Sequence, residues 1–174
     1  MDEHVAAFDV LSDSAHCTGL IAASLARHLH VGDVVLLTGD LAAGKTTAVQ
    51  AMAAALGSSD AVTSPTFALV NVYAASEAPI LHVDAYRLSG VHEFRDLGLD
   101  EYIEESVTLI EWGEVVADDF PCHLAVQLER PGGADADCRR ISIESACDDW
   151  LARMPRLRDD LTQAAAAPVG GPVR

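Results

Sequence analysis

A glycine-rich loop between an apolar run and an alanine-rich segment constrains this chain more than any other feature. The loop, residues 39–46, reads G-x-x-x-x-G-K-T. It follows the β-branched and leucine-rich run 34–38, and the segment 47–56 after it has high intrinsic helix propensity. Strand, glycine loop and helix, in that order, are the context in which this motif binds phosphate. The sequence therefore predicts a nucleotide-phosphate site at this loop.

Each part of the loop has a physical role in binding an anion. Glycines let the backbone wrap closely, so that successive N–H groups and the N-terminus of the new helix face a phosphate. Lys45, the only lysine in the chain, adds a cation for the β- and γ-phosphates, and the Thr46 hydroxyl is placed to coordinate Mg²⁺. The residues expected to bind the nucleotide are Gly39, Asp40, Leu41, Ala42, Ala43, Gly44, Lys45, Thr46 and Thr47.

Such a loop needs a further oxygen ligand for Mg²⁺, usually from the end of a buried strand. Asp84 ends the apolar run 80–83, and Glu111 ends the run 107–110. We assign Asp84 to Mg²⁺, directly or through water, and Glu111 to orienting or deprotonating the attacking water, although the two roles can be exchanged. The candidate metal ligands are Thr46, Thr66, Asp84 and Glu111, and the candidate catalytic residues are Lys45, Asp84 and Glu111.

The rest of the chain alternates strand and helix patterns. Strands are predicted at residues 5–11, 68–73, 80–87, 107–110, 123–129 and 139–145, and helices at 15–29, 91–105 (two short helices hinged at Gly98) and 148–161. Since the chain has 174 residues, half of them hydrophobic, we expect one domain at residues 1–149. Residues 150–174 then form a C-terminal helix and a tail, rich in Ala, Pro and Gly from 164 onward, that we expect to be disordered.

Charge and cysteine content limit the partners and the compartment. The net charge of −16 argues against a free-standing DNA or RNA binder, which normally shows a basic face. Cys17, Cys122, Cys138 and Cys147 show no C-x-x-C spacing, so reduced, buried cysteines of a cytoplasmic protein are expected. The acidic N-terminus is unlike a signal peptide, and no apolar run is long enough to span a membrane.

Four motifs taken together resemble those of the TsaE (YjeE) family, the bacterial ATPase of tRNA threonylcarbamoyladenosine synthesis. They are G-D-L-A-A-G-K-T-T (39–47), S-P-T-F (64–67), H-V-D-A-Y-R-L (82–88) and L-I-E-W-G-E (109–114). They occur in the family's order and spacing, and the resemblance runs from about residue 5 to residue 143. It implies a small P-loop NTPase-like α/β fold of three layers, with a mixed β-sheet flanked by helices.

The resemblance also implies an activity and partners. These are Mg-ATP binding, slow intrinsic hydrolysis, and action with TsaD and TsaB, which install threonylcarbamoyl on adenosine 37 of ANN-decoding tRNAs; tRNA is then met only through the complex. By position, Trp112 lies beside the nucleotide, although a packed core tryptophan fits its sequence equally well. Where the family usually has glycine this chain has Ala42, which costs about 1 kcal/mol if that position needs a positive φ.

Three other functions share this loop. A small-molecule kinase usually adds an arginine-rich lid, yet Arg87 and Arg95 are the only arginines between Lys45 and Arg130. A GTPase would need N-K-x-D, which a chain with one lysine, already in the loop, cannot have. An adaptor that binds ATP without hydrolysing it stays open. The basic end of the chain, with Arg153, Arg156, Arg158 and Arg174, is either a contact for a partner or tRNA or a solvated tail.

Overall fold

The computed structural model describes residues 5–65, 68–132 and 137–167, and its centre is a seven-stranded mixed sheet. The strands lie in the order β1-β7-β6-β2-β5-β4-β3. Their bounds are β1 Ala6–Ser12, β2 Val34–Thr38, β3 Val70–Tyr73, β4 Ile80–Asp84, β5 Val107–Glu111, β6 Leu124–Glu129 and β7 Arg139–Ser145. β4, β5, β2 and β6 run parallel to one another, whereas β3, β7 and β1 add as antiparallel strands. The predicted mixed sheet is confirmed.

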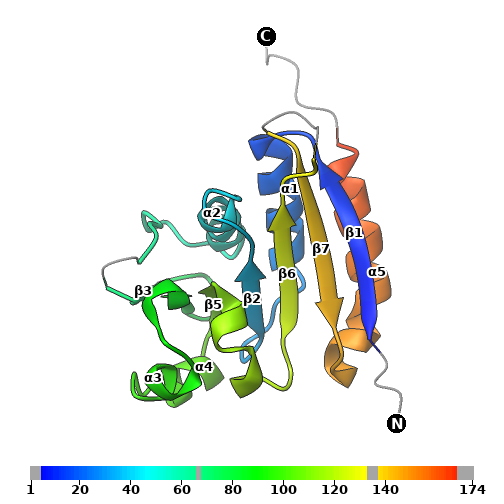
Figure 1. Cartoon of the computed structure of the whole chain (residues 1–174). Helices are drawn as coiled ribbons and strands as arrows, with labels where there is room; N and C mark the ends of the chain where they lie inside the picture. Colours follow the sequence, from blue (N-terminus) through cyan, green and yellow to red (C-terminus); the bar gives the residue numbers. More distant parts are fainter. Residues whose placement is uncertain (1–4, 66–67, 133–136, 168–174) are drawn as a thin grey trace.

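Helices cover both faces of this sheet, so the fold has the three layers that were predicted (Figure 1). Their bounds are α1 Ala15–Ala26, α2 Lys45–Ala55, α3 Val91–Arg95, α4 Asp100–Glu104 and α5 Asp148–Ala165, with short 3₁₀ turns at Ala85–Arg87, Gly113–Val115 and Ala117–Asp119. α1, α2 and α5 share one hydrophobic core with the sheet, and the segments around α3, α4 and the 3₁₀ turns close the other. The site described below lies beside α2.

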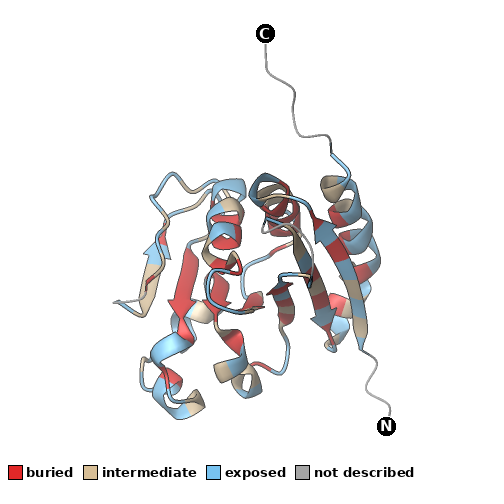
Figure 2. Cartoon of the chain, turned by 45° about the horizontal axis from the view of Figure 1, so that its top comes forward, coloured by how far each residue is buried: buried red, intermediate tan, exposed pale blue. Residues whose placement is uncertain are grey.

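The central strands are buried along their whole length because helices cover both of their faces. Every residue of β4 and β5 is buried, and Figure 2 shows buried residues along the middle of the sheet. Strand alternation sends Val35 and Leu37 into the first core and Val34 and Leu36 into the second. β6 instead alternates buried and less buried residues, as expected for the predicted hairpin with one exposed face.

α5 packs against the domain and continues further than expected. Its apolar stripe, Trp150, Met154, Leu157 and Leu161, is buried in the first core, and the helix runs beside β1 (Figure 1). Disorder was expected from residue 164, but the helix continues to Ala165 because Ala164 and Ala165 pack on the same core. The rest of that prediction, residues 168–174, lies outside the described residues.

The expectation of four reduced, buried cysteines was wrong. Cys122 and Cys147 form a disulfide, and Cys138 is only half-buried, while Cys17 is free and buried. Cys122 precedes β6 and Cys147 follows β7, so the antiparallel hairpin brings residues 25 positions apart to the same end of the sheet. Short-range spacing rules cannot detect such a pair.

Among the helices of the described ranges, none combines the length and the hydropathy needed to cross a bilayer.

Candidate functional site

The two glycines of the loop hold backbone conformations and contacts that a side chain would prevent. Gly39 has a φ of 131°, and a Cβ built on it would collide with the carbonyl oxygen of Leu128 on β6. Gly44 has a φ of 111° and stands directly before α2, where an L side chain is strained. The loop thus wraps closely around the N-terminus of α2, whose first N–H groups face outward for an anion.

Ala42 lies in the same loop with a φ of 61°, in the left-handed region. A positive φ was the condition under which alanine was expected to cost stability, and the structure shows that this condition holds. The strain is about 1 kcal/mol, because the Cβ of an L residue crowds its own carbonyl in this conformation. The loop of this chain therefore stores strain that a glycine would not.

Lys45, the first residue of α2, is folded back over the loop. Its Nζ donates hydrogen bonds to the carbonyl oxygens of Gly39 at 2.5 Å and Asp40 at 3.0 Å, and lies 3.8 Å from the centre of the Trp112 ring. Burial lowers the pKa of Lys45, and four nearby carboxylates, led by Glu111, partly oppose that shift. The ammonium group is thus held by neutral oxygens at the place where a more strongly charged phosphate would attract it.

The two acids end neighbouring parallel strands. Asp84 on β4 lies in register with Glu111 on β5, and they are 5% and 3% exposed. The Thr46 hydroxyl donates to both oxygens of Glu111, at 2.9 and 3.0 Å. Asp84 accepts from the Ser64 hydroxyl at 3.1 Å and from the Tyr86 N–H at 3.0 Å. Both carboxylates are therefore fixed at the same edge of the sheet, beside the loop.

A cleft of about 510 Å³ brings most of the sequence-predicted residues together. It is lined by Leu41, Ala42, Ala43, Gly44, Lys45, Thr46, Thr47, Ser64, Asp84, Tyr86, Glu111 and Trp112. Gly39 and Asp40 lie on the other side of the loop, and Thr66 lies outside the described residues. Trp112, with a φ of 58°, lines the cleft and also packs against the second core, and its place beside a nucleotide stays a prediction.

The side-chain groups of the cleft that could bind a metal ion are mostly oxygen atoms. A hydroxyl from Thr46 and carboxylates from Asp84 and Glu111 are the hard ligands that Mg²⁺ prefers, so the residues present fit this ion. Within the described ranges no group of three His, Cys, Asp or Glu side chains is arranged to hold a metal by itself. Mg²⁺ would therefore complete its shell with phosphate oxygens and water, as it usually does.

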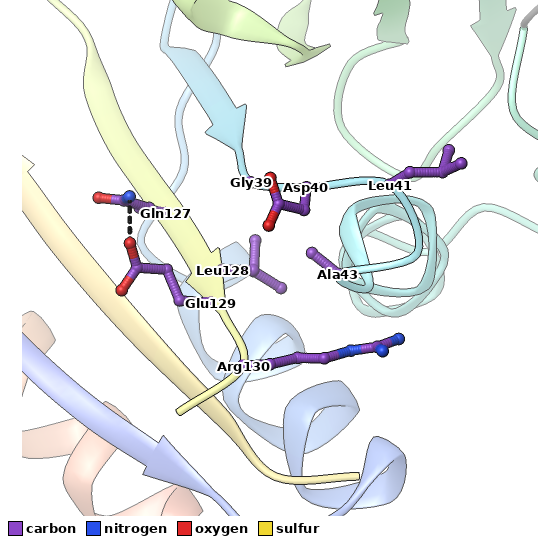
Figure 3. Close-up of a pocket in the computed structure, with 8 residues that line it drawn as sticks. All are labelled: Gly39, Asp40, Leu41, Ala43, Gln127, Leu128, Glu129 and Arg130. Atoms are coloured by element: carbon purple, nitrogen blue, oxygen red, sulfur yellow. Dashed lines mark hydrogen bonds between the residues drawn. The ribbon is translucent and has the colours of Figure 1, made fainter. Parts of the chain in front are cut away.

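A second pocket, of about 460 Å³, lies across the loop from the acids (Figure 3). It was not predicted from the sequence. Residues 39–41 and Ala43 form one wall, and residues 127–130 at the end of β6 form the other. Gln127 donates to Glu129 at 2.6 Å, and Arg130 donates to the carbonyl oxygen of Ala42 at 3.1 Å. Only the parallel pairing of β6 with β2 brings this segment to the loop, and no motif marks that pairing.

His82 is the other residue near the site to which the sequence gave no role. It lies on β4 with no exposed surface, 2.9 Å from the Oε1 of Glu111. The sequence did offer one signal that His82 has a partner, because it stands within an apolar run and burying a polar side chain without a partner is unfavourable.

Comparisons with known proteins agree on one family. Residues 12–141 match the family model described as threonylcarbamoyl adenosine biosynthesis protein TsaE. A Streptomyces coelicolor protein is 40% identical over 131 residues, which is 72% of this chain and 88% of the relative. A Bacillus subtilis protein is 39% identical over 138 residues, 76% of this chain and 86% of the relative. Both carry the name tRNA threonylcarbamoyladenosine biosynthesis protein TsaE. The crystal structure of Bacillus subtilis YdiB is similar with a TM-score of 0.75 at 28% identity, covering 90% of this chain and 97% of that one.

Proposed function

Because this chain belongs to the TsaE family, we propose that it binds and hydrolyses Mg-ATP as an accessory protein of tRNA threonylcarbamoylation. The observation that carries the proposal is the convergence of a phosphate loop and two buried acids on one cleft. Lys45 and Thr46 approach from α2, while Asp84 and Glu111 approach from β4 and β5. In the proposed site, α2 thus carries the phosphate-binding groups and the sheet carries the two acids.

The loop binds the phosphates. Backbone N–H groups and the N-terminus of α2 offer partial positive charge, and Lys45 exchanges its carbonyl partners for the β- and γ-phosphate oxygens. Thr46 and Asp84 would hold Mg²⁺, which would supply positive charge to neutralise the phosphates. The developing charge of phosphoryl transfer is then met by groups that are already in place, which is the main source of catalysis in such sites.

Glu111 acts on the attacking water. Its carboxylate is buried and hydrogen-bonded by Thr46, so its position relative to the loop is fixed before ATP arrives. A carboxylate that faces the γ-phosphate position orients a water molecule and accepts its proton. ATP turnover by this protein alone is slow in this proposal, because the described residues that line the cleft include no arginine to stabilise the transition state.

We place the nucleoside end of ATP in the second pocket, whose lining residues Figure 3 shows. Lys45, Thr46 and the acids occupy one side of the loop, so the terminal phosphates belong there and the chain of phosphates leads to the other side. That side is the pocket between the loop and residues 127–130. Gln127 and Glu129 there offer the hydrogen-bonding groups that a base or ribose needs.

The partners are TsaD and TsaB, and tRNA is met through their complex. A chain with a net charge of −16 is poorly suited to hold a polyanion directly, but it complements a basic protein surface. We place the protein in the cytoplasm together with these proposed partners. Neither membrane nor DNA takes part.

A kinase is the second candidate, and the structure does not favour it. Lys45 is the only Lys or Arg among the described residues that line the cleft, and Arg95 is paired with Asp119. The described residues that line this cleft therefore contain no arginine that could form a lid over the phosphates. An ATP-binding adaptor that does not hydrolyse its nucleotide differs only in the role of Glu111, which is an outcome of the experiments below.

The sole lysine offers a direct test of the binding site. An amine-reactive reagent can label only Lys45 and the α-amino group, and mass spectrometry separates the two products. We expect Mg-ATP to protect Lys45 and to leave the α-amino group, an internal control, as reactive as before. Equal labelling of Lys45 with and without Mg-ATP would contradict the proposed site, as would unchanged ATP affinity in Lys45→Ala.

A further inference from the structure

His82 occupies a position from which it can control Glu111. Strand alternation places His82 and Asp84 on the same face of β4, and Glu111 lies on the matching face of β5, under α2. His82 is fully buried, so no ligand in the cleft can reach it. Its Nε2 lies 2.9 Å from the Oε1 of Glu111, and its Nδ1 lies 3.3 Å from the Tyr73 hydroxyl.

We take Glu111 as a carboxylate, as its proposed role requires, and His82 as a neutral ring, and these two states set the direction of the hydrogen bonds. An ionised carboxylate has no proton to give, so the hydrogen between Glu111 and His82 belongs to Nε2 of the ring. In the neutral ring Nδ1 is then an acceptor, and the Tyr73 hydroxyl is the donor that faces it. The amide of Asn71 donates in turn to the Tyr73 oxygen at 3.1 Å. When Tyr73 donates to Nδ1, the donors run from Asn71 to Tyr73 to His82 to Glu111, and the Thr63 carbonyl is the second acceptor for the same Tyr73 hydroxyl.

At the Tyr73 end, this series of hydrogen bonds contacts Thr63, which directly precedes the S-P-T-F motif. The Tyr73 hydroxyl also lies 3.1 Å from the carbonyl oxygen of Thr63. One hydroxyl proton cannot serve both the Thr63 carbonyl and the His82 ring at full strength. The bond that keeps Nδ1 as an acceptor therefore competes with the bond that anchors Thr63.

Thr46 alone cannot keep Glu111 in place during turnover. Its hydroxyl donates to Glu111 in the structure, but the proposed function gives the same hydroxyl a role at Mg²⁺ and the phosphates. Beside Thr46, His82 is the side chain that donates to Glu111 among the described residues, and its burial makes that bond independent of what the cleft contains. A group supported in this way keeps the geometry that a general base needs.

We infer that His82 is a positioning residue that holds Oε1 of Glu111 through Nε2–H, with Tyr73 fixing the ring tautomer, so that Oε2 is presented to the attacking water. This inference rests on the proposed function, in which Glu111 acts on that water. His82 itself touches neither water nor nucleotide. It acts on turnover through Glu111 and leaves the phosphate-binding groups untouched.

The test separates turnover from binding in the full-length protein. We expect His82→Ala to lower kcat about 10- to 100-fold, because misplacing a reacting group by a fraction of a bond length has effects of this order. The Kd for Mg-ATP should change less than about threefold, since Lys45 and the loop are unaltered. His82→Gln, which keeps an N–H donor near Glu111, should recover most of kcat, and Tyr73→Phe should lose less than His82→Ala.

Matched controls make every outcome decisive. His92, exposed on α3, gives the control His92→Gln, which should match the unaltered protein. An unchanged kcat in His82→Ala overturns the inference, and so does a His82→Gln protein that folds but turns over as slowly as His82→Ala, because the ring would then do more than position. If His82→Ala does not fold, His82→Gln and Tyr73→Phe decide, and full kcat in Tyr73→Phe removes the tautomer role. An unaltered protein without any ATP turnover instead overturns the proposed function.

Discussion

Ala42→Gly should make this protein more stable, although glycine usually has the opposite effect. Ala42 is exposed and has a φ of 61°, a conformation that costs an L residue about 1–2 kcal/mol and costs glycine nothing. Glycine also gains conformational freedom in the unfolded chain, which lowers stability by about 0.5–1 kcal/mol. The difference is a net gain of about 0.5 kcal/mol in the free energy of unfolding.

The matched control is the same chemical change at a helical φ. Ala152 is exposed within α5, so Ala152→Gly keeps the unfolded-state penalty and relieves no strain. We expect it to lower the free energy of unfolding by about 1 kcal/mol. The two substitutions should thus differ by about 1.5 kcal/mol in opposite directions, and the difference measures the strain at Ala42.

Urea titration followed by circular dichroism gives both free energies, with m-values that show whether the unfolded state has changed. For a chain of this size 1 kcal/mol corresponds to about 2–4 °C in Tm, so Ala42→Gly should melt about 1–2 °C higher and Ala152→Gly about 2–4 °C lower. Equal destabilisation by the two substitutions would refute the reasoning, because it would mean that Ala42 is not strained.

Three further outcomes follow from the structure. Burial lowers the pKa of Lys45 and phosphates favour its ammonium form, so ATP binding should take up protons at alkaline pH and weaken as pH rises through that pKa. Calorimetry in two buffers measures the proton uptake, with Tyr86→Phe, a change elsewhere in the cleft, as the control. Arg153→Met keeps the side-chain stem but breaks a two-bonded ion pair to Asp33 and a contact with the Trp150 ring, so it should lower the free energy of unfolding by about 1–2 kcal/mol in urea titration. An unchanged midpoint would rule out a stabilising role for Arg153. Gln127→Ala should weaken the binding of ATP several-fold and leave the binding of inorganic tripolyphosphate unaffected. An equal loss of affinity for both ligands would argue against a nucleoside in the second pocket.

The sequence predicted what depends on local pattern and on the direction of parallel strands. The central strands read as apolar runs because helices bury both of their faces. Asp84 and Glu111 follow two such runs, and the carboxyl ends of parallel strands meet at one edge, so their convergence was foreseeable. The sequence also indicated that Ala42 would be strained if its φ were positive, because glycine is usual at that place in the motif.

What the sequence could not predict depends on contacts between distant segments. The strand predicted at 80–87 stops at Asp84, because its side chain accepts from the Tyr86 N–H and starts a 3₁₀ turn. The partners of His82 come from two neighbouring strands, β3 and β5, and no spacing rule reports that neighbourhood. The pocket at Gln127 likewise requires knowing that β6 lies next to β2.

We propose that this cleft hydrolyses ATP under the control of the tRNA-modifying partners. ATP turnover by the full-length protein, alone and with the TsaD–TsaB complex and tRNA, tests it most directly, with Glu111→Gln measured in parallel. We predict slow turnover by the protein alone, strong stimulation by the complex, and a Glu111→Gln protein that binds ATP but loses about 10²- to 10⁴-fold in rate. Turnover that ignores the partners, survives in Glu111→Gln, or appears only with a small-molecule acceptor that becomes phosphorylated would contradict it.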